Sequence, residues 1–328
     1  CLDLENIKKN LNSNTGAVCL VHIGGVITDE IHEIKKFCDD NNIHLIEDAA
    51  HGHGSSFDGK YPGQFGIAAA YSFFSTKTFT SGEGGMVLTN DKLLDENCRR
   101  LRDYGKKSQW ESVHTVFSGN YRMSNLTATV GNNHTSELSD FLSKRDRIAN
   151  YYTKNLSDKY EKILPEGKSG WYKYIVYLPK NINKKDFKEK CKNKGLGLPG
   201  GVYDQPIHLQ PVMKEYLKNE SFPVAEEVCE RHVCLPIYPN LSEEETEQTV
   251  KIWLVGEAKE APKGDFAGWV RRIAPDKIEI SQPCGTTLSF TQKPASGDAE
   301  TLIAAGSALG ASTSTISKSL LLLEEKTA

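Results

Sequence analysis

Short apolar runs alternate with segments of helical spacing through the first part of the chain. Residues 17–23 form an apolar run that ends at two glycines, which indicates a buried strand. Apolar positions recur at helical spacing over residues 31–38, with Thr28 or Asp29 as the expected helix cap. Residues 43–46 form the next apolar run. This order predicts parallel strands joined by a crossover helix, an arrangement in which ligands bind at the carboxyl ends of the strands.

Further elements follow along the chain, and their character changes after a proline and a glycine near residue 165. The earlier pattern predicts strands at residues 69–74 and 86–89 and helices at residues 91–104 and 124–156. The later pattern predicts an aromatic and β-branched strand at residues 171–178 and helices at residues 186–193, 224–231 and 242–255.

These patterns predict an α/β fold with two domains and an extension. We expect a large, mostly parallel sheet domain over residues 1–161 and a smaller α+β domain over residues 162–257. Residues 258–328 have some strand character at 278–290, and a small, polar and poorly patterned segment at 304–318. We assign this extension no fold and expect a poorly ordered appendage, with a small appended domain as the alternative.

Composition narrows the class of protein. The chain has 328 residues, 38% hydrophobic and 25% charged, as is usual for a soluble globular protein. A net charge of −3 gives no reason to expect a nucleic-acid or membrane-surface partner, and no apolar run is long enough to span a membrane. The eight cysteines are scattered without a CxxC pair, which favours reduced thiols and a cytoplasmic location.

One lysine and one carboxylate carry the candidate chemistry. Lys77 follows the strand predicted at residues 69–74 and precedes the glycine-rich turn GEGG at residues 82–85. An amine held there can attack a carbonyl once burial or a nearby cation deprotonates it. Asp48 ends another apolar run. Pyridoxal phosphate (PLP) needs this pair, because the lysine attaches to its aldehyde and the carboxylate keeps its pyridine nitrogen protonated.

With these residues identified, residues 1 to about 256 resemble the DegT/DnrJ/StrS family of PLP-dependent sugar aminotransferases. The matching segments, in the family's order, are residues 21–22 (VH), 47–54 (EDAAHGHG), 63–66 (GQFG), 72–77 (SFFSTK), 82–85 (GEGG), 102–105 (RDYG), 120–125 (NYRMSN), 206–211 (PIHLQP) and 235–239 (LPIYP). A single glycine-rich loop would be weak evidence, but this many ordered matches are strong evidence. The resemblance implies the PLP-dependent transferase fold type I.

The resemblance also implies roles for matching residues around the cofactor ring. Lys77 matches the lysine that holds PLP covalently and moves the proton during transfer. Asp48 matches the carboxylate that pairs with the pyridinium nitrogen. His51 matches the residue that packs near the ring and its O3′ side.

Three further positions match residues at the edges of the site. Ser72 matches a hydroxyl on the cofactor phosphate. Asn120 matches a residue that reaches the phosphate from the neighbouring subunit, which implies a homodimer. His208 lies in a segment that helps to shape the nucleotide-sugar pocket.

The chain departs from the family at its start. Members carry an earlier portion that supplies a Ser-Gly-Thr-like turn for the phosphate, an aromatic residue stacked on the pyridine ring and the first strands of the large sheet. Residues 1–16 cannot replace these parts. We therefore expect an N-terminally truncated aminotransferase with an incomplete large sheet and an unrelated C-terminal extension.

Two clusters invite a metal hypothesis. His51 and His53 lie one residue apart, but no cysteine or glutamate lies at a ligand spacing from them. Cys229, His232 and Cys234 form a second cluster, which is more typical of core packing at the end of a helix. We therefore predict no metal site.

The predicted activity is amino transfer to a nucleotide-linked keto-sugar, with glutamate as the donor that the family implies. Two alternatives remain. Some family members dehydrate sugars, but they replace the cofactor-binding lysine by histidine, so Lys77 argues against that activity. The chain could also be a non-catalytic interaction module that lacks part of the cofactor site.

Overall fold

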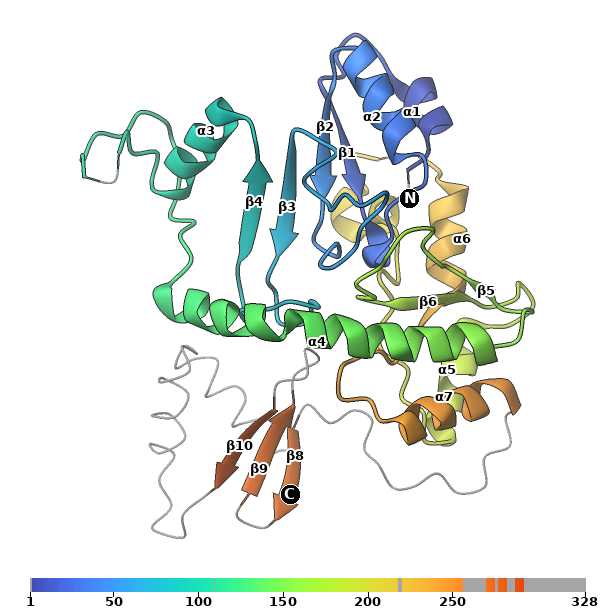
Figure 1. The fold of residues 1–328 in the computed structure, drawn as a ribbon. Coiled ribbons are helices and arrows are strands. Elements are labelled where there is room, and N and C mark those ends of the chain that lie inside the picture. Colours follow the sequence, from blue (N-terminus) through green and yellow to red (C-terminus); the bar gives the residue numbers. More distant parts are fainter. Residues whose placement is uncertain are drawn as a thin grey trace.

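The computed structural model describes residues 2–108, 110–217 and 220–255, together with three later strands (Figure 1). These strands are β8 (Val270–Ala274), β9 (Lys277–Ser281) and β10 (Thr287–Thr291), and they pair antiparallel in the order β10-β9-β8. The strand character predicted at residues 278–290 is thus confirmed for β9 and β10. The low-complexity segment predicted at residues 304–318 lies outside the described residues.

A four-stranded sheet forms the first layer of the fold. Its strands are β1 (Ala17–Val21), β2 (His44–Asp48), β3 (Ala68–Ser72) and β4 (Gly85–Thr89), in the order β1-β2-β3-β4. The first three are parallel, and β4 runs antiparallel to β3. The predicted α/β architecture with a mostly parallel sheet is therefore confirmed. The carboxyl ends of β2 and β3 meet at one edge of this sheet, where ligands bind in such folds.

Two helices cover one face of β1 and β2. They are α1 (Leu4–Asn10) and α2 (Ile31–Asp40), which lie together beside these strands (Figure 1). Alternate residues of β1 are buried, and Leu20 of β1 packs in one cluster with Ile31 and Ile34 of α2. Each fully buried aliphatic side chain of this kind contributes about 1.5–3 kcal/mol to stability.

Helix α2 begins later than the sequence predicts. The expected cap at Thr28 or Asp29 is wrong, because α2 starts at Ile31 behind Glu30, whose side chain does not cap the helix. The Thr28 carbonyl instead accepts a hydrogen bond from the Ile31 amide in the preceding turn. The Glu30 carboxylate accepts one from the Leu4 amide and so ties α2 to α1.

Beyond β4, the chain continues through an exposed helix and loop. Helix α3 (Lys92–Arg102) is capped by Asp91, whose carboxylate accepts from the Leu94 amide. None of its residues is buried, and the side chains of Met86 and Val87 on β4 are half exposed. Figure 1 shows α3 and the following loop outside the β4 edge of the sheet.

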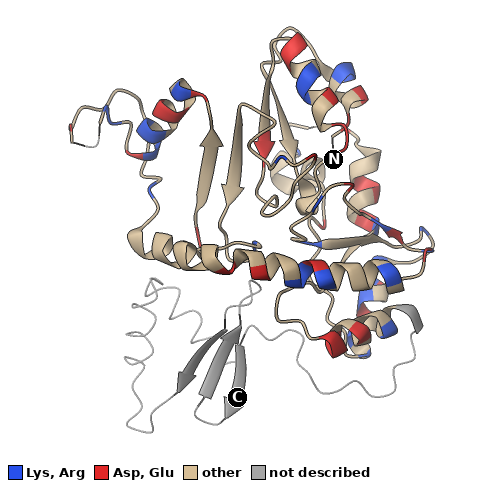
Figure 2. Ribbon diagram, viewed as in Figure 1, with Lys and Arg blue, Asp and Glu red and all other residues tan. Residues whose placement is uncertain are grey.

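The long helix α4 (Asn125–Asn155) joins the first sheet to a second one. It starts at the predicted position, where the Ser124 hydroxyl caps it by accepting from the Thr127 amide. Its charged residues gather on its C-terminal half (Figure 2). That half also buries Ile148 and Tyr152 in the core of the second part of the molecule.

This second part contains a small antiparallel sheet and three helices. The strands are β5 (Glu161–Lys162), β6 (Tyr174–Tyr177) and β7 (His232–Leu235), in the order β5-β6-β7, and the helices are α5 (Lys184–Asn193), α6 (Pro223–Arg231) and α7 (Glu243–Val255). Short 3-10 turns are η1 (Ile23–Gly25), η2 (Ile207–Leu209) and η3 (Pro211–Met213). This is the predicted α+β composition. The predicted domain boundary after residue 161 stays a prediction. Helix α4, which precedes that boundary, contributes side chains to this second core.

The strand predicted at residues 171–178 is shorter than expected. It begins only at Tyr174, because Trp171 has a positive φ of 49°, which no strand residue adopts. No helix of the described residues is long and apolar enough to cross a membrane.

Candidate active site

Lys77 and Asp48 lie at neighbouring strand ends, as the sequence predicts. Asp48 is the last residue of β2 and pairs with Ala70 of the parallel strand β3. Lys77 lies in the turn after β3, where its amide donates to the carbonyl of Phe74 over 3.0 Å. The Asp48 carboxylate accepts a 3.0 Å hydrogen bond from the Ala50 amide, which fixes its orientation at the strand end.

The buried position of Lys77 favours the uncharged, nucleophilic form of its amine. Burial lowers the pKa of Lys77, because it disfavours the ammonium form. The Asp48 carboxylate acts to raise that pKa, and the ammonium group of Lys173 acts to lower it. The net shift is downward, so a larger fraction of the amine is uncharged at neutral pH. The charge of Asp48 thus acts on Lys77 from the neighbouring strand end.

His51 is a buried, neutral ring in this space. Its Nδ1 accepts a 3.2 Å hydrogen bond from the Gly24 amide. Burial, with the positive charges of Lys77 and Lys173, lowers the pKa of His51 to about 3. The ring is therefore uncharged at neutral pH, and it stacks on Tyr172 with the ring centres 4.1 Å apart.

Tyr172 and Lys173 belong to the site, and the sequence analysis missed both. The Lys77 Nζ lies 4.7 Å from the centre of the Tyr172 ring, and the Lys173 Nζ lies 5.3 Å from it. The Tyr172 hydroxyl is 3.2 Å from the hydroxyl of Thr76. Their sequence position gave no signal, because both lie in the run that predicted a strand interior.

Gly170 allows this segment to approach the first sheet. A Cβ on Gly170 would lie 1.7 Å from the carbonyl oxygen of His53, so only glycine fits. The Gly170 amide donates to the Ser55 hydroxyl, and its carbonyl accepts from the Thr78 hydroxyl. These contacts bind the segment before β6 to the loops that follow β2 and β3.

His53 lies behind this site among aromatic rings. Its ring is 5% exposed and contacts Tyr71, Phe73 and Phe79. Burial and the charge of Lys77 lower the pKa of His53 to about 4, so this ring is also neutral. The described residues contain no group of three His, Cys, Asp or Glu side chains placed to hold a metal ion.

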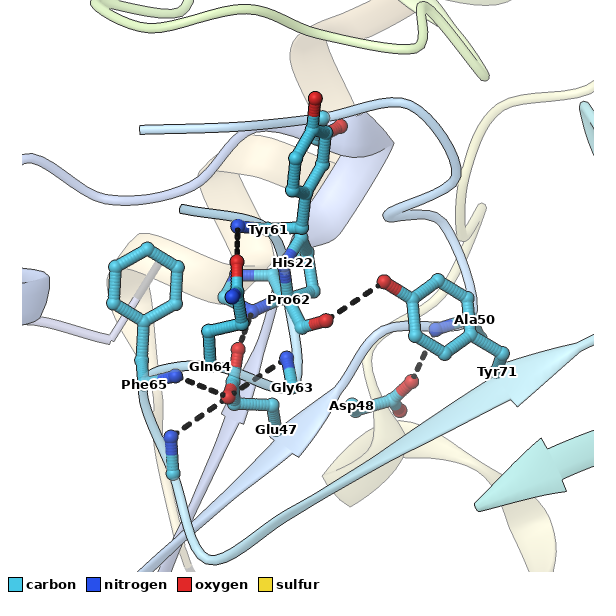
Figure 3. A network of polar contacts seen from close by, with 12 residues as sticks. His22, Glu47, Asp48, Ala50, Tyr61, Pro62, Gly63, Gln64, Phe65 and Tyr71 are labelled. Carbon is cyan, nitrogen blue, oxygen red and sulfur yellow. Dashed lines mark hydrogen bonds and ion pairs between the residues drawn. The ribbon is translucent and has the colours of Figure 1, made fainter. Parts of the chain in front are cut away.

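Glu47, next to Asp48, anchors the strand end (Figure 3). Its fully buried carboxylate accepts hydrogen bonds from His22 Nε2 at 2.9 Å and from the amides of Gly63, Phe65 and Gly66 at 2.7–3.1 Å. Three segments that matched the family separately in the sequence therefore meet at one carboxylate. The sequence analysis assigned Glu47 no role.

The remaining predicted residues lie in different surroundings. Ser72 ends β3, and its half-buried hydroxyl accepts from the Phe74 amide. Asn120 is exposed on the loop after α3, and its side-chain oxygen accepts from Arg122. His208 is buried in η2, where its Nε2 lies 2.9 Å from the Glu226 carboxylate and its ring packs on Phe222. Of these three residues, only Ser72 lies on β3, the strand that leads into the turn with Lys77.

Comparison with known proteins decides the family. A model of the DegT/DnrJ/EryC1/StrS aminotransferase family matches residues 1–253. The chain belongs to this family.

Two related GDP-perosamine synthases have similar sequences. The one from Escherichia coli O157:H7 is 32% identical over 247 residues, which are 74% of this chain and 66% of the relative. The one from Vibrio cholerae is 29% identical over 254 residues, or 75% and 68%. The chain thus spans about two thirds of the length of these relatives.

Solved structures support the same fold. DesV of S. venezuelae, in complex with a ketimine intermediate, is 25% identical with a TM-score of 0.71, covering 79% of this chain and 70% of that chain. A GDP-4-keto-6-deoxy-D-mannose-3-dehydratase of E. coli with hydrated PLP has a TM-score of 0.70 over 77% and 70%, and its 20% identity shows the fold alone. The predicted PLP-dependent fold type I is confirmed.

The residues of this site fit PLP, the cofactor of the family. PLP is an aldehyde with a basic pyridine nitrogen. It needs an uncharged amine near its aldehyde and a carboxylate near its nitrogen. Lys77 supplies an amine with a lowered pKa, and Asp48 supplies a carboxylate whose charge acts on it. His51 adds a neutral ring that can pack beside the cofactor without a competing charge.

Proposed function

We propose that this chain is part of a PLP-dependent aminotransferase that moves an amino group from glutamate to a nucleotide-linked keto-sugar. The observation that carries the proposal is the placement of Lys77, a half-buried amine in the turn after β3, next to the strand end that holds Asp48. The lowered pKa of Lys77 supports it. Membership of an aminotransferase family supports the reaction type. The relatives named GDP-perosamine synthase, and one named as a dTDP-sugar 4-aminotransferase from Saccharopolyspora spinosa, support the nucleotide-sugar substrate.

Lys77 has two tasks in this proposal. Its uncharged amine attaches the cofactor to the protein. When that amine is free, it takes the proton from the α-carbon of the amino donor and later returns a proton to the sugar carbon that gains the amino group. The lowered pKa suits both tasks, because a general base works best when its pKa is near the working pH.

Asp48 and His51 set the electrostatics of the ring. When bound, PLP supplies an electron sink for the electron pair left on the α-carbon. Asp48 holds the proton on the pyridine nitrogen that makes this sink effective, since a nearby carboxylate favours the charged form of a base. His51 packs beside the ring as a neutral imidazole and therefore does not oppose that positive charge.

The other predicted residues act at the periphery. Ser72, at the end of β3, donates its hydroxyl to the cofactor phosphate. His208 helps to shape the pocket for the nucleotide-sugar, in the orientation set by its contact with Glu226.

Asn120 completes the phosphate site of a neighbouring subunit in a homodimer. It lies on an exposed loop with Phe117, which is fully exposed, and Tyr121, which is largely exposed. Exposed aromatic rings gathered on one loop favour association. Light scattering tests this step: a particle of twice the chain mass supports it, and a single-chain mass contradicts it.

The six cysteines of the described part are free thiols, which supports a reducing, cytoplasmic location. Cell fractionation with trapping of free thiols checks this, and recovery from an oxidising compartment would contradict it.

A sugar dehydratase shares the fold, so dehydration is the alternative activity to compare with amino transfer. The family's dehydratases carry histidine where this chain carries Lys77, which favours amino transfer.

The test is an amino-transfer assay on the purified chain loaded with PLP. With L-glutamate and a nucleotide-linked 4-keto-6-deoxy sugar, we expect both 2-oxoglutarate and an amino sugar. Lys77→Arg should reduce the rate by at least about 10²-fold, the usual contribution of a general base. Lys168→Arg, on an exposed lysine, is the matched control. Release of a deoxy-sugar without an amino group, or full activity of Lys77→Arg, would refute the proposal.

A further inference from the structure

Lys173 places a second ammonium group beside the Lys77 site. Both lysine Nζ atoms approach one ring, that of Tyr172, at 4.7 Å for Lys77 and 5.3 Å for Lys173. Lys173 is half-buried, and its amine donates a long, 3.5 Å hydrogen bond to the Gly200 carbonyl. Among the ion pairs of the described residues, none includes Lys77 or Lys173. No carboxylate of the described residues therefore pairs with the ammonium group of Lys173.

The groups that face Lys77 come from three segments. Asp48, at the end of β2, contributes a negative charge that favours the ammonium form of Lys77. His51 and His53, from the loop after β2, are neutral at neutral pH because of their lowered pKa values. Lys173, from the segment before β6, contributes the positive charge that opposes Asp48. Burial is the largest influence on Lys77, and one anion and one cation set the balance of charge around it.

The groups that face Lys173 keep that cation uncompensated. Arg145 of α4 and Lys188 of α5 are positive, and both act to lower the pKa of Lys173. Cys234 of β7 could compensate them only as a thiolate, but burial raises the pKa of its thiol to about 11. Burial is the largest influence on Lys173 itself and also lowers its pKa. Within the described part of the chain, a neutral thiol and two further cations therefore leave Lys173 without an anionic partner.

We propose that Lys173 is a positioning residue for Lys77: its ammonium group, held beside the shared Tyr172 ring, acts against the charge of Asp48 and, together with burial, favours the uncharged, nucleophilic form of the Lys77 amine. The proposal rests on the proposed function, since Asp48 must stay ionised for the cofactor ring while Lys77 must stay uncharged to attack it. A lone carboxylate would meet the first need and oppose the second. A cation near Lys77 reconciles them, because like charges disfavour protonation.

The test measures the titration of Lys77 without cofactor or substrate. The protein is acetylated with trace acetic anhydride over a series of pH values, and the labelling of each lysine is read by mass spectrometry of its peptides. Removing the charge in Lys173→Gln raises the pKa of Lys77. The Lys77 labelling curve should therefore move to higher pH, and its labelling at neutral pH should fall roughly two- to fivefold.

Four variants separate charge from structure. Lys173→Arg keeps the charge and should follow the wild-type curve. Lys173→Met keeps the aliphatic stem without the charge and should follow Lys173→Gln. Lys168→Gln removes an exposed charge from the same segment and should leave Lys77 unchanged. Asp48→Asn should move the curve to lower pH, because the charge that favours the ammonium form is gone.

The outcomes are decisive in either direction. A wild-type Lys77 curve in both charge-free variants, or equal shifts in Lys173→Arg and Lys173→Met, would overturn the role of the Lys173 charge. The remaining lysines, labelled in the same samples, report whether a variant is folded. The measurement needs no PLP, so a failure of the proposed amino transfer would leave this result intact, and the two ideas can fail separately.

Discussion

The carboxylate of Glu47 connects three segments beside the proposed catalytic residues. Burial by itself acts to raise the pKa of Glu47, but hydrogen bonds from His22, Gly66 and Gly63 outweigh it and the net pKa is lowered. A carboxylate with a lowered folded-state pKa stabilises the fold above its unfolded pKa, which is 4.5 for glutamate. That stabilisation is lost as the pH falls through the lower, folded value.

We expect Glu47→Gln to reduce the free energy of unfolding by about 3 kcal/mol at pH 7, because a neutral amide replaces a buried, charged acceptor of four hydrogen bonds. Urea unfolding at several pH values measures this. The wild type should lose stability as the pH falls below about 4.5, and the variant should lose less of it. Glu166→Gln, on an exposed glutamate, is the control. Equal unfolding free energies for Glu47→Gln and the wild type would contradict the anchoring role.

Sequence reasoning reached some residues of the site and not others. Lys77 and Asp48 could be predicted, because a strand end and a glycine-rich turn place them by local rules alone. The role of Glu47 could not, since its partners are recognisable as donors only when three segments fold together. Tyr172 and Lys173 are a harder case. The hydroxyl of Tyr172 lies near that of Thr76, although the two residues are 96 positions apart in the sequence. Hydrophobic and polar patterning does not predict contacts over such a separation.

At the scale of elements, the segment between α4 and β6 decides the geometry of the site. Arg145 of α4 donates to the Trp171 carbonyl, and the Trp171 indole donates to Asp146, so the bend is fixed from both sides. Gly170 permits the backbone to touch that of His53. The segment therefore carries Tyr172 and Lys173 to Lys77.

We expect Gly170→Ala to destabilise the protein by about 3 kcal/mol, because the new methyl group would overlap a backbone oxygen that cannot move aside easily. Urea unfolding measures the change. Gly16→Ala is the matched control, since a Cβ there meets nothing within 4 Å and should have little effect. A Gly170→Ala variant as stable as Gly16→Ala would show that the two segments do not pack as described.

Most elements could be predicted from the sequence, and the errors have local causes. Helices α3 and α4 are capped by Asp91 and Ser124, the residues at which the pattern predicted these helices to start. Helix α5 begins two residues before the predicted start because Asn183 caps it. The start of β6 was wrong because a left-handed residue, Trp171, interrupts a run that otherwise favours a strand.

At the scale of the whole molecule, the fold joins two sheets through one long helix. The α/β class and the family could be predicted, since they depend on the order of strands, helices and matching segments. How the segment before β6 docks onto the first sheet could not, because it depends on a close backbone approach at Gly170. The proposed site therefore combines a predicted half, around Lys77 and Asp48, with an unexpected half around Tyr172 and Lys173.

The most direct test of the central claim is the site at which PLP attaches to the protein. The purified chain is mixed with PLP, the adduct is fixed with borohydride, and the modified peptide is identified by mass spectrometry. We expect one dominant modification at Lys77, its loss in Lys77→Ala, and no change in Lys168→Ala. Modification spread over many lysines, or an unchanged adduct in Lys77→Ala, would contradict the account.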